Sequence, residues 1–84
     1  MKVKELKKLL DSVDEDKIII LQKDGEGNGY SPLSNIDSNC VYEADSTYSG
    51  NVGIEFLTPE LRKQGYSEED MLVGESALVL YPIN

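Results

Sequence analysis

Apolar residues near the start of the chain recur at spacings of three and four, the period of one helical face. They are Val3, Leu6, Leu9, Leu10 and Val13. Lysines and acidic residues occupy most of the positions between them. This pattern predicts an amphipathic helix over residues 3–12, and the polar sequence DSVDED that follows predicts its end.

Four later stretches have the character of β-strands. Residues 17–23 contain three consecutive isoleucines, which are β-branched and favour a strand over a helix. Their unbroken apolar run is typical of a strand at the centre of a sheet. Residues 52–57 alternate with a period of two, and residues 39–43 and 76–82 complete the set. We expect the two most apolar strands, 17–23 and 76–82, to be neighbours.

Two short helical turns are predicted between the third strand and the last. Thr58 followed by Pro59 is typical of a helix start, because threonine caps the first amides and proline fits the first helical position. Gly65 then predicts the end of a helix over 59–64. Ser67 and Asp70 have the spacing of a capping box, which indicates a second turn over 68–72.

These elements predict an α+β fold, with the N-terminal helix and the short helical turns packed on a small, mainly antiparallel sheet of about four strands. A length of 84 residues suffices for a single domain, residues 1–84, with a modest core. We expect one shared core formed by Val3, Leu6, Leu10, Ile19, Leu21, Phe56, Leu78 and Leu80.

The glycine-rich stretch KDGEGNGYSP, residues 23–32, raises the question of a ligand loop. It lacks the glycine spacing, the following helix and the lysine of a phosphate-binding loop. Asp24, Glu26 and Asn28 match the first half of a calcium loop, but Asn35 stands where a bidentate glutamate is required. We expect no calcium affinity tighter than millimolar. A plain turn with several residues at positive φ and a recognition loop both remain open.

Candidate catalytic groups are few, since the chain has no histidine, one arginine and one cysteine. Cys40 has no neighbouring cation in the sequence that would activate it, so a small core side chain is the favoured interpretation. The acidic clusters 14–16 and 68–70 lie in polar turns and are expected to be solvated. We therefore predict that the protein is not an enzyme and has no catalytic residues, metal site or cofactor.

The charge is unevenly distributed along the chain. The net charge is −8, but residues 1–23 carry six lysines against five acids, and residues 24–84 carry two basic residues against eleven acids. Such a chain is repelled by nucleic acid and by anionic membranes, so the expected partner has a basic surface. No apolar run is long enough to span a bilayer, and the charged N-terminus lacks the apolar region of a signal peptide. We expect a cytoplasmic protein.

Tyrosine is the most frequent aromatic residue, and three tyrosines fall in predicted loops beside acidic residues. Aromatic side chains in such positions are common contacts in protein interfaces. The candidate partner-binding residues are Asp24, Glu26, Asn28, Tyr30, Asp45, Tyr48, Tyr66, Glu68 and Glu69.

Several segments, KVKELKKLL, IIILQKD, DGEGNGYSPLSNI and SALVLYPIN, together resemble a family of small accessory proteins of tailed bacteriophages. The resemblance covers most of the chain, with residues 50–75 matching most loosely and DGEGNGYSPL most specifically. It implies a protein made in the cytoplasm of an infected bacterial host, where it binds a host factor such as a defence protein, a nuclease or a transcription component.

The leading hypothesis is a phage-encoded acidic binding protein that inhibits such a host factor, in its sharpest form by presenting a DNA-like acidic face. One alternative is a sponge that holds a small ligand, a nucleotide signal, between protomers. Another is a structural or virion accessory protein with a self-complementary surface. A homo-oligomer is compatible with all of them. Capture of a stoichiometric partner from host lysate would favour the first hypothesis.

Overall fold

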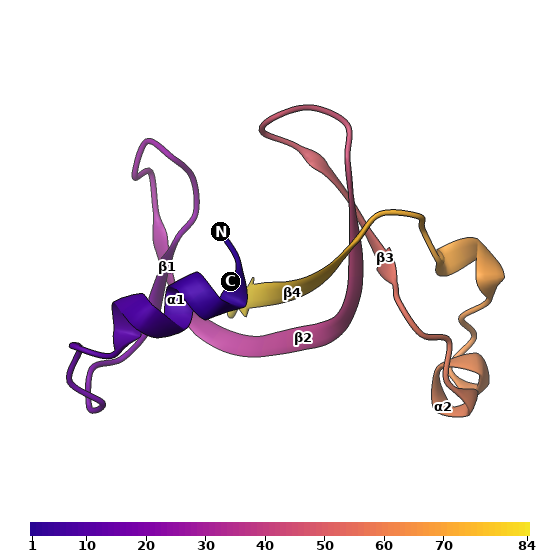
Figure 1. Ribbon diagram of the computed structural model, residues 1–84, viewed down its shortest axis with the longest axis horizontal. Coiled ribbons are helices and arrows are strands. Elements are labelled where there is room, and N and C mark those ends of the chain that lie inside the picture. The colour runs from indigo at the N-terminus through magenta and orange to yellow at the C-terminus, as the bar shows by residue number, and fades with distance from the viewer. The chain divides into compact units, whose positions relative to one another are not determined.

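A computed structural model describes all residues, 1–84 (Figure 1). It contains a short N-terminal helix, four strands and two further helical turns, which confirms the predicted α+β class. In chain order the elements are α1 (Val3–Leu10), β1 (Ile20–Gln22), β2 (Tyr30–Ala44), β3 (Gly50–Ile54), α2 (Pro59–Lys63), the 3₁₀ turn η1 (Glu68–Asp70) and β4 (Glu75–Pro82).

The chain divides into two compact units. The first unit comprises residues 1–35 and 80–84, and the second comprises residues 36–79. The first unit contains α1, β1, the start of β2 and the end of β4, and the second contains the remaining elements. The prediction of one domain over residues 1–84 stays a prediction.

Strand β2 is the common partner in the sheet. β1 pairs with its start in antiparallel register, with Ile20 opposite Pro32, and β3 pairs with its end, with Cys40 opposite Ile54. β4 also pairs with β2, so the prediction that the first and last strands are neighbours was wrong. The reason is the length of β2, because residues 30–38 continue the strand where the sequence indicated a polar connection.

The helical turns follow their sequence signals closely. The Thr58 hydroxyl accepts a hydrogen bond from the Leu61 amide at 3.2 Å and caps α2. Ser67 and Asp70 form the predicted capping box at the start of η1, where the Asp70 carboxylate accepts from the Ser67 amide at 2.9 Å. α1 begins without a side-chain cap, and Lys7 in its last turn interacts favourably with the helix dipole. None of the helices is long and apolar enough to cross a membrane.

Few side chains are buried. Only Ser31, Cys40 and Val41 have exposed fractions below a tenth, which agrees with the interpretation of Cys40 as a core residue. The predicted shared core was wrong, since none of its members is buried. Three are half-buried: Leu6, Leu21 and Leu78. Five are exposed: Val3, Leu10, Ile19, Phe56 and Leu80.

The expected central position of the isoleucine run was also wrong. Ile18, Ile19 and Ile20 are 82%, 55% and 44% exposed, and only the last of them lies in β1. A hydrophobic period identifies residues that share a face of a helix or strand. It does not establish that another layer of the same chain covers that face.

Candidate interaction surface

The glycine-rich segment forms the turn that joins β1 to β2. The Lys23 amide donates to the Gly29 carbonyl at 2.8 Å, and this bond closes the loop. Inside it, the Asp24 carboxylate accepts from the amides of Glu26 at 2.8 Å and Asn28 at 3.2 Å. Gly27 is the only residue of the loop at positive φ, so the expectation of several such residues was wrong. Hydrogen bonds to one aspartate side chain shape this turn instead.

The same hydrogen bonds determine the electrostatics of Asp24. The pKa of the Asp24 carboxyl lies below its usual range mainly because its carboxylate accepts a hydrogen bond from the Asn28 amide. The hydrogen bond from the Glu26 amide makes a smaller contribution. The carboxylate organises the loop backbone. No group of three or more histidine, cysteine, aspartate or glutamate side chains is placed to hold a metal ion. The weak calcium affinity expected of this loop stays a prediction.

We expect the Asp24 carboxyl to titrate below its unfolded value in an NMR titration of the folded protein. Because the folded pKa is depressed, the stability from these hydrogen bonds is complete above the unfolded pKa of about 3.9. It is lost as the pH falls through the lower folded pKa. The same titration in urea is the control and should return the ordinary value. Identical curves in both states would contradict the hydrogen-bonded turn.

The turn between β2 and β3 presents Tyr48 to solvent. The Ser46 hydroxyl accepts from the amides of Tyr48 at 3.3 Å and Ser49 at 3.1 Å, and the Ser49 hydroxyl donates to the Asp45 carboxylate. This network uses the polar side chains of the turn. The Tyr48 side chain is left 90% exposed, the position expected of a loop tyrosine available to a partner.

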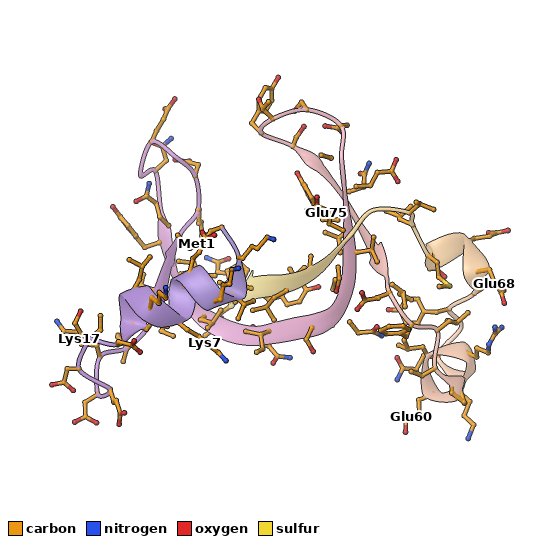
Figure 2. The ribbon with its side chains drawn as sticks, viewed as in Figure 1. Met1, Lys7, Lys17, Glu60, Glu68 and Glu75 are labelled. Carbon is orange, nitrogen blue, oxygen red and sulfur yellow. The ribbon has the colours of Figure 1, made fainter.

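A third part of the surface lies around α2 and η1. The Arg62 guanidinium is 2.6 Å from the Glu68 carboxylate, and this hydrogen bond lowers the pKa of Glu68. Tyr66, between the two helical turns, is 45% exposed. Glu60 and Glu68 extend from the ribbon of this region (Figure 2). Since Glu68 is already paired with Arg62, it contributes less negative field to a partner than an unpaired acid would.

The candidate residues are divided between the two units. Asp24, Glu26, Asn28 and Tyr30 belong to the first unit. Asp45, Tyr48, Tyr66, Glu68 and Glu69 belong to the second. Tyr30, expected in a loop, is the first residue of β2 and is 64% exposed.

Sequence reasoning missed several apolar members of the exposed surface of the second unit. Val73 is 92% exposed and Phe56 is 67% exposed, and Val52 and Met71 are also exposed. Alternation over 52–57 placed Phe56 in the core, whereas the strand ends at Ile54, before Phe56. The one sequence signal for the exposure of Val73 is its position between the expected helical turn over 68–72 and Gly74, in a connection between elements.

Most of the negative charge of the chain lies in the second unit. The second unit, 36–79, carries nine acidic residues and two basic ones, a net charge of −7. The first unit carries six lysines and seven acids, a net charge of −1. The second unit therefore joins a strong negative charge to exposed aromatic and aliphatic side chains.

No protein-family model, no curated protein and no solved structure matches this chain. The resemblance to phage accessory proteins accordingly stays a prediction.

Proposed function

We propose that this protein is an acidic binding protein that engages and blocks a basic surface of a partner protein through its second unit. The observation that carries the proposal is the coincidence, within residues 36–79, of a net charge of −7 with exposed Tyr48, Phe56 and Val73. Protein interfaces commonly combine aromatic and aliphatic contacts with a polar rim, and exposed apolar patches mark interaction sites. The acids supply attraction to a basic surface over long range.

The class of partner follows from the same charge. Basic surfaces are the electrostatic signature of proteins that bind nucleic acid, because those proteins neutralise phosphates with lysine and arginine. The resemblance to phage accessory proteins implies that such a partner belongs to an infected bacterial host. A defence protein, a nuclease or a transcription component fits this description, with the acidic unit competing for the surface that nucleic acid would occupy.

The residues of the second unit argue against a site for an anionic small ligand there. Its only cations are Arg62 and Lys63, and Arg62 is already paired with Glu68. A phosphate-bearing ligand would meet nine acids with one uncommitted lysine. Recognition of a nucleotide signal by this unit is therefore disfavoured on electrostatic grounds.

The test begins with affinity capture from host lysate and continues with surface plasmon resonance against the captured protein. We expect the association rate to fall about tenfold or more between low and physiological salt, because screening weakens electrostatic steering. Tyr48→Ala should speed dissociation with little change in the salt dependence.

Ile18→Ala is the control, since Ile18 is 82% exposed, lies in the first unit and is not among the candidate partner-binding residues. It should leave the dissociation rate unchanged. An association rate that is independent of salt, or a captured partner that is itself acidic, would overturn the proposal. Equal effects of the two substitutions would exclude the second unit as the binding surface.

A further inference from the structure

Asn28 is the only asparagine of the chain that precedes a glycine. It lies in the turn between β1 and β2 and is exposed. Its main-chain amide donates to the Asp24 carboxylate at 3.2 Å, and its side-chain amide also donates a hydrogen bond to this carboxylate. The carboxamide group of Asn28 is therefore at the surface, next to the main-chain nitrogen of Gly29.

The main-chain nitrogen of Gly29 is uncommitted. The Gly29 carbonyl accepts from the Lys23 amide at 2.8 Å, but the Gly29 nitrogen donates no hydrogen bond to the protein. The residue lies just before β2, outside the paired part of the sheet. It has no side chain that would obstruct the approach of its nitrogen to the Asn28 carboxamide. The two residues thus place a nucleophilic nitrogen and an amide carbon in adjacent, accessible positions.

We propose that Asn28 is a site of spontaneous deamidation, in which the Gly29 nitrogen attacks Cγ of the Asn28 side chain. The nitrogen loses its proton to hydroxide and forms a bond to Cγ, and the Cγ–Nδ2 bond breaks to release ammonia. Water then opens the cyclic imide at either of its carbonyl carbons. Attack at Cγ gives aspartate, and attack at the main-chain carbon gives isoaspartate. An amide and water become a carboxylic acid and ammonia, with no change of oxidation state.

The other asparagines that precede a residue lack this arrangement. Asn35 and Asn51 lie in β2 and β3, and each is followed by a β-branched residue whose side chain hinders the attacking nitrogen. The Asn39 carboxamide donates to the Phe56 carbonyl at 3.0 Å and accepts from the Phe56 amide at 2.8 Å. These two hydrogen bonds hold its side chain away from its own main chain. The reaction is therefore expected at Asn28 alone.

Asp24 also precedes a glycine, Gly25, and can form the same cyclic imide in principle. That reaction requires the protonated acid, because an ionised carboxylate is a poor electrophile. The Asp24 carboxylate accepts from the amides of Glu26 at 2.8 Å and Asn28 at 3.2 Å, which turns it across the loop and favours its ionised form. The hydrogen bonds of the turn therefore protect Asp24 and leave Asn28 as the reactive residue.

Conversion of Asn28 alters the loop in two ways. The new carboxylate changes the net charge of the chain from −8 to −9 and lies beside Asp24, where an amide donor was before. In the isoaspartate form the main chain also passes through Cγ and gains one atom. That atom lies inside the loop that the hydrogen bond between Lys23 and Gly29 closes. We expect this bond to weaken, so that the Lys23 amide exchanges its hydrogen about tenfold faster in the isoaspartate form.

Incubation of the full chain at physiological temperature and mildly alkaline pH tests the site. Isoelectric focusing should show a more acidic form, and peptide mapping should locate the change at Asn28. An isoaspartate methyltransferase with a labelled methyl donor should label the same peptide. Because the reacting species is the deprotonated Gly29 amide, the initial rate should rise about tenfold for each unit of pH.

Gly29→Ala should slow the conversion about tenfold or more, because a Cβ obstructs the attacking nitrogen. The fold should tolerate it, since Gly29 is not at positive φ and the nearest atom to the new Cβ is Cδ of the flexible Lys23 side chain, at 3.2 Å. Gly25→Ala is the matched control, because a Cβ there meets nothing within 4 Å. It should leave the rate at Asn28 unchanged.

The same incubation in urea distinguishes the folded loop from its bare sequence. We expect conversion of Asn28 in both states. Conversion only in urea would overturn the proposal, since the folded turn would then hold the Asn28 carboxamide away from the Gly29 nitrogen. Methyl labelling at Asp24 in place of Asn28, or equal rates in Gly29→Ala and the wild type, would overturn it as well.

Discussion

Gly74→Ala is expected to leave little folded protein at physiological temperature. A Cβ at this position would lie against the Tyr42 carbonyl oxygen, closer than real Cβ atoms approach, and 2.8 Å from the carbonyl carbon. It would also lie 3.1 Å from Cγ1 of Val41, one of the few buried side chains. The obstructing atoms are mostly backbone and cannot rotate away. We expect a loss of about 3 kcal/mol, a large part of the roughly 5 kcal/mol that stabilises a small domain.

Urea denaturation followed by circular dichroism measures this loss. Gly25→Ala is the matched control, because a Cβ there meets nothing within 4 Å and the residue does not require positive φ. That variant should unfold at nearly the wild-type midpoint. Similar midpoints for Gly74→Ala and the wild type would show that β2 and the start of β4 are not so closely apposed.

Ser31→Ala is expected to have the second largest effect. The Ser31 hydroxyl is fully buried and accepts from the amides of Ile83 at 3.0 Å and Asn84 at 3.2 Å. It also donates to the Pro32 carbonyl at 3.0 Å. Alanine would remove this acceptor from both amides, which lie in a partly buried position. We expect the free energy of unfolding to fall by about 1–3 kcal/mol.

Hydrogen exchange localises this effect as well as detecting it. In Ser31→Ala the Asn84 amide should exchange much faster, whereas Ile83 also donates to the Pro32 carbonyl at 3.0 Å and should lose less protection. Ser34→Ala, on an exposed serine of the same strand, is the control and should change neither. Unaltered exchange at Asn84 would contradict the role of the Ser31 hydroxyl.

Local signals in the sequence predicted local structure well. The Thr58–Pro59 pair located the start of α2, and the spacing of Ser67 and Asp70 predicted a capping box that the structure contains. The apolar period over residues 3–13 predicted α1, which ends two residues earlier than expected, at Leu10. Each of these signals depends on contacts between residues a few positions apart, so the sequence contains the whole interaction.

Features that depend on distant residues were not predictable in the same way. The sequence of residues 31–39 is rich in serine and asparagine, which disfavour strands, yet pairing with β1 and β4 keeps this segment extended. The shared core failed for a related reason. Periodicity placed Leu10 correctly on the apolar face of α1 but could not show that this face remains open. It also extended the third strand to Phe56, which lies beyond the end of β3.

The candidate surface was likewise predictable only where it depends on residues close together in the sequence. Tyr48 and Tyr66 lie in turns and are exposed, as their polar and glycine neighbours indicated. The Arg62–Glu68 pair was not foreseen, because it depends on how α2 and η1 are placed together rather than on either alone. Val73 was missed because a single valine in a turn has no periodic signal.

The scarcity of buried side chains has a thermodynamic consequence. The heat-capacity change of unfolding and the denaturant slope both scale with the surface that unfolding exposes. With three buried side chains, an isolated chain should show a heat-capacity change well below the roughly 1 kcal/mol/K usual for its length, and a broad transition. A partner bound to the exposed apolar residues of α1 buries additional surface in the folded state, and unfolding then exposes that surface as well. The transition should therefore sharpen, and its midpoint should rise, as the concentration of the covering partner increases.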